Sequence, residues 1–240
     1  TKELLPFCIN NLAPVVNKVI VVYSTVSNRG NKDDSISELV FGNLPCQWVN
    51  YEPELGLACH ENETRKRNFG LKVAKDQGFT HFLIADADEF YKQDEFLREK
   101  QRMEESNLNG LVCRLKVYLK DPTLCTDDHT LVPFIQRLKP ETLVGNYKKY
   151  PFNMDAEGNV HIDPTRRVNH FDRVEMSDIF MHHYSYVRKD IDMKIDNSSA
   201  NLQRARKVIF EEMQNAQPGY MSKLYHRPLE FVPNYFNISI

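Results

Sequence analysis

The 240-residue sequence predicts an α/β protein, a three-layer sandwich with a mostly parallel central sheet. Two observations carry this prediction. Short apolar and β-branched runs alternate with helix-favouring segments over the first half of the chain, a pattern typical of strands buried on both faces. The second half is irregular and rich in Pro, Asp and His. We therefore expect a scaffold in the first half and a substrate-shaping region in the second.

The expected elements follow in chain order. A helix over 2–13 precedes a strand over 18–23, and a shorter strand follows at 48–51. A helix over 61–77 is favoured by its Arg, Lys and Ala residues and is ended by Gly78. The remaining elements are a strand over 81–85, a helix over about 93–106, strands over 110–119 and about 131–138, and a basic helix over about 198–215.

Composition excludes several classes of protein. The 31 basic and 33 acidic residues give a net charge of −2 and a pI near 6.4, so no nucleic-acid partner is expected. No apolar run approaches the roughly 18 residues of a membrane-spanning helix. The five cysteines form no C-x-x-C pair, as is typical of a reducing compartment. We expect a cytoplasmic protein, at most peripheral to a membrane.

The most informative stretch is the acidic run Asp86-Ala87-Asp88-Glu89, which directly follows the strand over 81–85. Carboxylates two residues apart at the end of a buried strand can both address the carboxyl edge of the sheet, where open α/β sheets bind ligands. Mg²⁺ and Mn²⁺ prefer oxygen ligands and keep positions for substrate phosphates. The pattern predicts a metal–diphosphate site, and the alternative is a solvated acidic turn that caps the next helix.

Two phosphate chemistries place D-x-D after a strand. Phosphatases and mutases of the haloacid-dehalogenase type require Thr or Val two residues later, where this chain has Phe90, and they carry the motif on their opening strand. Nucleotide-sugar transferases of the GT-A fold instead carry a basic helix before the motif. The segment from Glu63 to Gly70, with Arg65, Lys66 and Arg67, is such a helix.

One sequence pattern carries a family resemblance. Arg67-Asn68-x-Gly70-x-x-x-Ala74, then Gly78 and an apolar strand into Asp86-x-Asp88, resembles the core of family-2-type GT-A glycosyltransferases. Bacterial and large-DNA-virus members with a D-x-D-E-F motif, such as a viral rhamnosyltransferase domain, are particularly similar. The resemblance covers about residues 15–120.

The resemblance implies a function. It implies a GT-A (Rossmann-like) fold, a nucleoside-diphosphate sugar donor (UDP-linked), a hydroxyl acceptor in surface glycan synthesis, Mn²⁺ or Mg²⁺ as cofactor, and transfer with inversion of a hexose or deoxyhexose. Asp86 would approach the ribose and help hold the metal with Asp88. Arg65 or Arg67 would hold the base or diphosphate, unless they form a solvated helix face.

The resemblance also divides the chain. No internal repeat and no low-complexity linker is visible, so we expect one domain over 1–240. Within it, the resemblance implies a nucleotide-sugar-binding half over 1–120 and an acceptor-binding half over 121–240. The family opens with a strand and a Pro-containing loop that holds the nucleobase, whereas the strand over 18–23 matches the family's second strand. We therefore expect either an opening strand upstream of Thr1 or a departure from the pattern.

A histidine pair, His182-His183, is the second dense candidate. Imidazole is a common metal ligand, and many GT-A enzymes complete their metal site with a late histidine. Adjacent side chains on a strand point to opposite faces, so at most one is a ligand; His182 is preferred, and both could be packing residues. Arg188, Lys189 and Lys194 could bind diphosphate oxygens or form a solvated charge run.

An inverting transferase also needs a carboxylate general base. The candidates are loop residues after the acidic run, and Asp127-Asp128 is favoured because it follows a strand and a Pro-containing turn; the full set is Asp127, Asp128, Asp155 and Asp163. An aromatic loop could stack on a sugar ring or belong to the core; it contains Asn146, Tyr147, Tyr150, Phe152 and Asn153.

Two other functions remain open. A nucleotidyltransferase that uses Mg-NTP should carry a Gly-rich loop with Arg and Lys near the N-terminus, and none is visible. A non-catalytic α/β domain that binds a sugar or a partner protein is the other. The basic helix, with Arg204, Arg206 and Lys207, could touch a membrane surface or cover its own sheet. The oligomeric state is not predicted.

Overall fold

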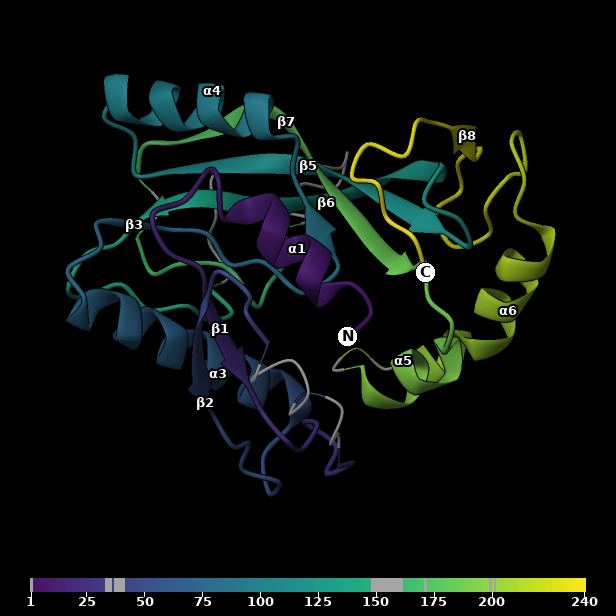
Figure 1. The fold of residues 1–240 in the computed structure, drawn as a ribbon, viewed down its shortest axis with the longest axis horizontal. Helices are drawn as coiled ribbons and strands as arrows, with labels where there is room; N and C mark the ends of the chain where they lie inside the picture. Colours follow the sequence, from purple (N-terminus) through teal and green to yellow (C-terminus); the bar gives the residue numbers. More distant parts are fainter. Residues whose placement is uncertain are drawn as a thin grey trace.

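The structure is a computed structural model, and it describes residues 2–32, 36, 42–147, 162–170, 172–198, 200 and 202–240. Figure 1 shows strands in two groups, with helices packed around them. In chain order the elements are α1 (Leu5–Leu12), β1 (Ile20–Tyr23), β2 (Gln47–Asn50), α3 (Cys59–Asp76), β3 (His81–Phe82), β4 (Glu89–Phe90), α4 (Gln93–Glu105), β5 (Gly110–Leu119), β6 (Leu124–Arg137), β7 (Val174–Tyr186), α5 (Ile191–Asn197), the 3₁₀ helix η1 (Leu202–Ala205), α6 (Arg206–Asn215) and β8 (Glu230–Phe231).

The strands form two sheets. β1 and β2 pair in parallel, from Ile20 opposite Gln47 to Tyr23 opposite Asn50. The larger sheet has the order β3-β6-β5-β7-β4, with β8 also paired to β6. Within it, β5 and β7 are parallel and the other described pairs are antiparallel. The α/β class is confirmed, whereas the larger sheet is mixed rather than mostly parallel.

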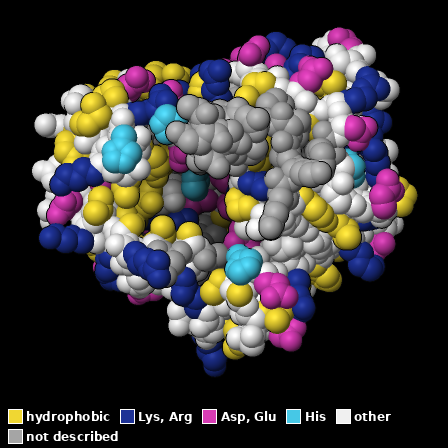
Figure 2. Space-filling view, turned by 180° about the vertical axis from the view of Figure 1, so that it is seen from behind, with side chains coloured by type: hydrophobic (Ala, Val, Ile, Leu, Met, Phe, Trp, Pro, Cys, Tyr) yellow, Lys and Arg dark blue, Asp and Glu magenta, His cyan; other side chains and the backbone are white. Residues whose placement is uncertain are grey.

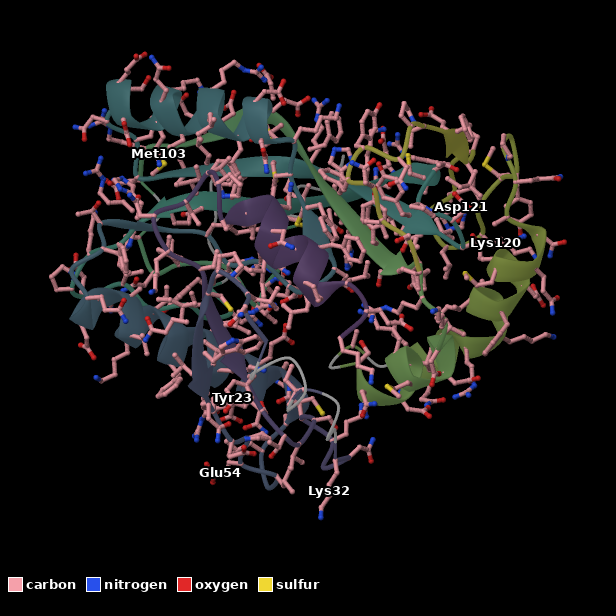
Figure 3. The ribbon with its side chains drawn as sticks, in the orientation of Figure 1. Tyr23, Lys32, Glu54, Met103, Lys120 and Asp121 are labelled. Carbon is pink, nitrogen blue, oxygen red and sulfur yellow. The ribbon has the colours of Figure 1, made fainter. Side chains whose placement is uncertain are left out.

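The turn between β5 and β6 explains part of this difference. Lys120 has a positive φ of 65°, and the Asp121 carboxylate accepts a hydrogen bond of 2.7 Å from the Thr123 amide. Such an Asx turn reverses the chain within a few residues, and strands joined by a short turn must be antiparallel. Figure 3 labels Lys120 and Asp121 at this turn.

Several element boundaries differ from expectation. β6 begins at Leu124, so Asp127 and Asp128 lie inside a strand and not in a loop. The strand expected over 81–85 pairs over only two residues. β7 is a 13-residue strand in the half that was expected to be irregular. The basic helix is split into η1 and α6, and α5 precedes them.

Helices cover the sheets on several sides. In Figure 1, α4 lies along β5 and β7, α3 lies beside β1 and β2, and α1 lies between these two groups. The side chains of α1 pack in both directions, because Leu4 and Cys8 join the main core whereas Leu5 and Ile9 join a cluster with β1. Figure 3 labels Met103 beneath α4, and this side chain is buried. α1 therefore fastens the small sheet to the larger one.

The acidic run lies where the chain crosses the end of the larger sheet. β3 is one edge of the strand order and β4 is the other, so residues 83–88 pass from one edge to the other. β4 then pairs with β7, with Glu89 opposite His183 and Phe90 opposite His182. The crossing brings residues of the first half against β7 and the residues that follow it.

Two findings bear on compartment and membrane. All five cysteine thiols are free in the structure. Among the described residues, no helix combines the length and the apolar character that crossing a membrane requires. In the basic helix, the Arg206 guanidinium is already paired with Asp192 and Asp196, so part of its charge is neutralised within the chain.

Candidate active site

A cleft of about 1470 Å³ contains the acidic run and reaches both halves of the chain. Figure 2 shows that the face opposite to that of Figure 1 is hollowed, with apolar, acidic and basic side chains around the hollow. The charged and polar residues that line the cleft include Glu63, Lys66, Arg67, Asp86, Asp88, Glu89, Asp128, Asp163, Arg166, His183, Tyr186, Arg188, Lys194 and Tyr225.

Arg166 organises the floor of this cleft. Its side chain is only 3% exposed, and its guanidinium donates to both carboxylate oxygens of Glu89, at 2.5 and 2.7 Å. It also reaches Asp86 at 2.8 Å and Asp163 at 2.9 Å. Glu89 accepts in addition from the Asp86 amide at 2.8 Å. Burial raises the pKa of Glu89, and the Arg166 guanidinium opposes that rise. A buried ion pair, linked to the Asp86 amide through Glu89, thus holds the backbone of the acidic run in place.

Asp86 is the more exposed carboxylate, with 48% of its side chain open to the cleft. Its oxygens lie 3.3 and 3.4 Å from Arg67, which also binds Glu63 at 2.5 Å. Partial desolvation raises the pKa of Asp86, but Arg166 and Arg67 outweigh that effect and lower it. Asp86 is therefore an ionised carboxylate that is partly exposed to the cleft.

Asp88 is almost completely enclosed by cations. Its Oδ2 accepts from Arg188 and lies 3.1 Å from Lys194 and 3.6 Å from Nε2 of His183. Burial raises the pKa of Asp88, but Lys194, His183 and Arg188 together hold it well below its usual range. Arg188 lies just after β7 and Lys194 lies in α5, so the second half of the chain supplies the counter-charge.

The two histidines have different surroundings. The side chain of His183 faces Asp88, whereas His182 is 2% exposed and lies among Tyr118, Tyr235 and Phe236. Nδ1 of His182 is 2.7 Å from the Tyr118 hydroxyl, and burial lowers the pKa of His182 to about 3. The structure therefore brings His183, and not the preferred His182, to the acidic run.

The basic residues of α3 differ in whether they line the cleft. Arg65 is 49% exposed, binds Glu54 at 2.7 Å and does not line the cleft, so the structure does not bring it to the site. Arg67 and Lys66 do line the cleft. Burial lowers the pKa of Lys66, and no carboxylate of the described residues forms an ion pair with it. Lys66 is a cation still available to an anionic ligand.

The candidate bases Asp127 and Asp128 lie on opposite faces of β6, because adjacent side chains on a strand point in opposite directions. Asp127 is 42% exposed and binds Lys116 at 2.7 Å, outside the cleft. Asp128 lines the cleft, accepts from the Thr130 amide at 2.8 Å and has no ion-pair partner among the described residues. Asp163 is held by Arg166 and Arg67. Asp155 lies outside the described residues, as do Tyr150, Phe152 and Asn153 of the aromatic loop.

Arg166, the central residue of the site, was not predicted from the sequence. Its partners Asp86 and Glu89 lie 80 and 77 residues away, so no local pattern marks it. One signal was available: Asp163-Pro164-Thr165-Arg166 places a basic residue after an Asp in a turn, and Asp163 accepts from the Thr165 amide at 2.8 Å. The same turn brings the Thr165 hydroxyl to Arg67.

The donor set can be compared with what a divalent cation requires. Asp88 and His183 offer an oxygen and a nitrogen to the cleft, but among the described residues no three His, Cys, Asp or Glu side chains converge as a metal site. Mg²⁺ is often held by one or two carboxylates, with the rest of its coordination supplied by water and substrate phosphates. A cation of that kind bound here would take Asp88 as an oxygen ligand and would compete with Arg188 and Lys194 for it.

Comparisons with known proteins add little to this site. No protein-family model matches the chain, and no curated protein sequence does. Among solved structures, S. aureus TarS 1-349 has a TM-score of 0.45 and 17% identity, over 90% of this chain and 63% of the TarS chain. A second S. aureus TarS structure has a TM-score of 0.42 and 18% identity, over 90% of this chain and 38% of that one. This chain thus spans less than two thirds of either TarS chain, and a likeness at these scores establishes neither a shared fold nor a shared activity.

Proposed function

We propose that the protein is a GT-A-type glycosyltransferase that moves a sugar from a nucleoside-diphosphate donor, UDP-linked, to a hydroxyl acceptor in surface glycan synthesis. One observation carries the proposal. One part of the wall of a single cleft holds the acidic run with its paired basic side chains, and another part holds Asp128, a carboxylate that has no ion-pair partner among the described residues. The first arrangement suits an anionic leaving group, and the second suits proton removal.

The cations would receive the diphosphate. Arg188 and Lys194 share one oxygen of Asp88, and Lys66 has no ion-pair partner in the described part of the chain. Charge-assisted hydrogen bonds from Arg and Lys are the strong interactions by which proteins bind phosphate. Negative charge grows on the diphosphate as the glycosidic bond breaks, so these groups stabilise the transition state more than the ground state.

Asp128 would act as the general base. Its carboxylate lines the cleft and has no ion-pair partner among the described residues, so a lone pair remains for the acceptor proton. In the proposed step the acceptor oxygen attacks the anomeric carbon and its proton passes to Asp128. The bond between that carbon and the diphosphate oxygen breaks, and its electron pair leaves with the nucleoside diphosphate. In-line attack of this kind inverts the anomeric centre.

A divalent cation, Mn²⁺ or Mg²⁺, would be held by Asp88 with His183, and Asp86 would face the ribose. When bound, it would supply positive charge to the diphosphate. The chain's own contribution is the fixed position of these side chains, because Arg166 holds Glu89 and Asp86 together.

Calorimetry and turnover test the proposal together. UDP- and GDP-sugars and NTPs are titrated with and without Mn²⁺, and release of nucleoside diphosphate is measured for wild type and for Asp88→Asn. We expect metal-dependent binding of a nucleotide sugar and a loss of turnover of about 10²-fold or more in the variant. The melting temperature of each protein shows whether the fold is retained.

Each alternative has its own outcome. A preference for NTP would indicate a nucleotidyltransferase, and sugar binding without any metal dependence or turnover would indicate a non-catalytic domain. Unchanged turnover in a folded Asp88→Asn protein would also overturn the assignment.

A further inference from the structure

A group of three polar side chains in the cleft stands apart from the acidic run. Asp128 lies on β6, Tyr186 ends β7, and Tyr225 comes from the C-terminal segment after α6. The phenols of Tyr186 and Tyr225 lie near each other, because each affects the pKa of the other. The charge of Asp128 acts on both phenols, and that of Asp88 acts on Tyr186. The two tyrosines therefore lie within electrostatic range of the carboxylate proposed as base.

A buried carboxylate holds Tyr225 in this position. Glu212 on α6 is 1% exposed, and its oxygens accept from the Ser222 hydroxyl at 2.7 Å and from the Lys223 amide at 2.6 Å. The Ser222 hydroxyl in turn accepts from the Tyr225 amide at 3.1 Å. Burying a carboxylate is unfavourable unless hydrogen bonds compensate it, and here the compensation comes from the turn that carries Tyr225. The turn is thus firmly attached to α6.

The chemistry of this group defines a class of ligand. Burial, and then the neighbouring Tyr186 phenol and the charge of Asp128, raise the pKa of Tyr225 well above its usual value, so the phenol stays a neutral donor and acceptor. An aromatic face can also pack on the apolar face of a sugar ring. Asp128 would repel a phosphate or carboxylate placed beside it.

We propose that Tyr186 and Tyr225 form, with Asp128, the acceptor subsite, and that the acceptor there is a neutral ring with several hydroxyl groups. This inference rests on the proposed function and specifies the acceptor class. The two phenols orient the ring, and Asp128 faces the hydroxyl that reacts. Tyr186 and Tyr225 are positioning residues for that hydroxyl.

Turnover by Tyr225→Phe and Tyr186→Phe tests the subsite. UDP-sugars are supplied with water alone, or with neutral p-nitrophenyl hexosides, or with the matching uronates, and release of UDP is followed. Loss of one hydrogen bond of roughly 0.5–1.5 kcal/mol should raise the KM for the neutral hexoside about 2- to 12-fold, and transfer should fall relative to hydrolysis. Uronates should be poorer acceptors than hexosides for wild type.

Two further variants control the result. Ser222→Ala frees the turn but keeps the hydroxyl of Tyr225, and it should change the KM in the same direction by less. Tyr235→Phe, at a 42% exposed ring beside Lys92, should leave unchanged both the KM for the hexoside and the ratio of transfer to hydrolysis. An equal fall of hydrolysis and transfer in Tyr225→Phe would overturn the proposal, as would an unchanged KM.

Direct binding keeps this test separate from the proposed function. Saturation-transfer NMR with methyl hexosides is compared for wild type and Tyr225→Phe. A weaker signal in the variant supports the subsite even if no nucleotide sugar is turned over, which would by itself defeat the transferase assignment. Equal signals in the two proteins would defeat the subsite alone.

Discussion

The two carboxylate-bearing parts of the cleft differ in how their charge is balanced. Asp86 and Asp88 each contact at least two cationic side chains, whereas Asp128 accepts one backbone hydrogen bond and has no ion-pair partner among the described residues. Cations lower the pKa of Asp88 and so make it a weak proton acceptor. Carboxylates in one cleft can thus differ strongly in basicity, according to the charges beside them.

Among the predicted changes, removing Arg166 from the ion-paired carboxylates should have the largest effect on stability. Arg166→Met leaves Glu89 buried without its counter-charge and also deprives Asp86 and Asp163 of theirs, so we expect the free energy of unfolding to fall by about 3–5 kcal/mol. Urea denaturation measures the loss. Arg206→Met, at a 37% exposed ion pair, is the control and should cost at most about 1 kcal/mol. Equal losses in both variants would contradict a structural role for the buried network.

Asp128, which has no ion-pair partner among the described residues, should affect turnover and not stability. Asp128→Asn removes the proposed base but no ion pair, so turnover should fall by about 10²-fold or more while the unfolding free energy changes by less than about 0.5 kcal/mol. Nucleoside diphosphate release and urea denaturation, measured on the same preparation, check both parts. A variant that stays active but is strongly destabilised would reverse the comparison.

His182 gives a smaller effect that depends on pH. Because burial lowers its pKa to about 3, the folded protein excludes a proton that the unfolded chain binds below a pKa of roughly 6.5. Its contribution to stability is complete above pH of about 6.5 and declines as the pH falls toward 3, by about 1.4 kcal/mol per pH unit.

Urea denaturation between pH 7.5 and 5 tests this slope. The slope of stability against pH should become flatter in His182→Phe. A substitution of the exposed His129 is the control and should leave the slope unchanged. An identical slope in His182→Phe and wild type would show that His182 does not exclude the proton.

The smallest effect is expected at Asp127. Its carboxylate is 42% exposed and paired with Lys116 outside the cleft, so Asp127→Asn should cost less than about 1 kcal/mol of stability and change turnover by less than about twofold. The same two assays apply. A large loss of turnover here would exchange the roles assigned to Asp127 and Asp128.

Local sequence pattern was enough for part of the fold. β1, β2, α3, α4 and β5 all lie close to their expected positions, because each has a hydrophobic period or a cap that can be read within a few residues. Gly78, for example, has a positive φ of 77° just after α3, as its position at the helix end predicts.

The remaining features of the fold and the site depend on contacts between residues far apart in the sequence. β7 was not predicted because polar residues such as Ser177 and His182 are buried along it, and only pairing with β5 and β4 explains their burial. The register that places Glu89 opposite His183 also decides which histidine faces Asp88. Asp86 and Asp88 line the cleft, and their predicted role as ligands stays a prediction; Arg166 depends on a contact that no local pattern reports.

The small sheet has a consequence for local stability. Two-stranded sheets are marginal in isolation, and within the described residues β1 pairs with β2 alone. Packing from α1 and α3 must therefore hold the pair in place. Amide hydrogens of Val21 and Val22 should exchange with deuterium faster than those at the centre of β5, as in a unit that opens before the protein unfolds globally. The part of the cleft wall formed by β1 would thus open and close locally, while the buried ion pairs keep the acidic run in place.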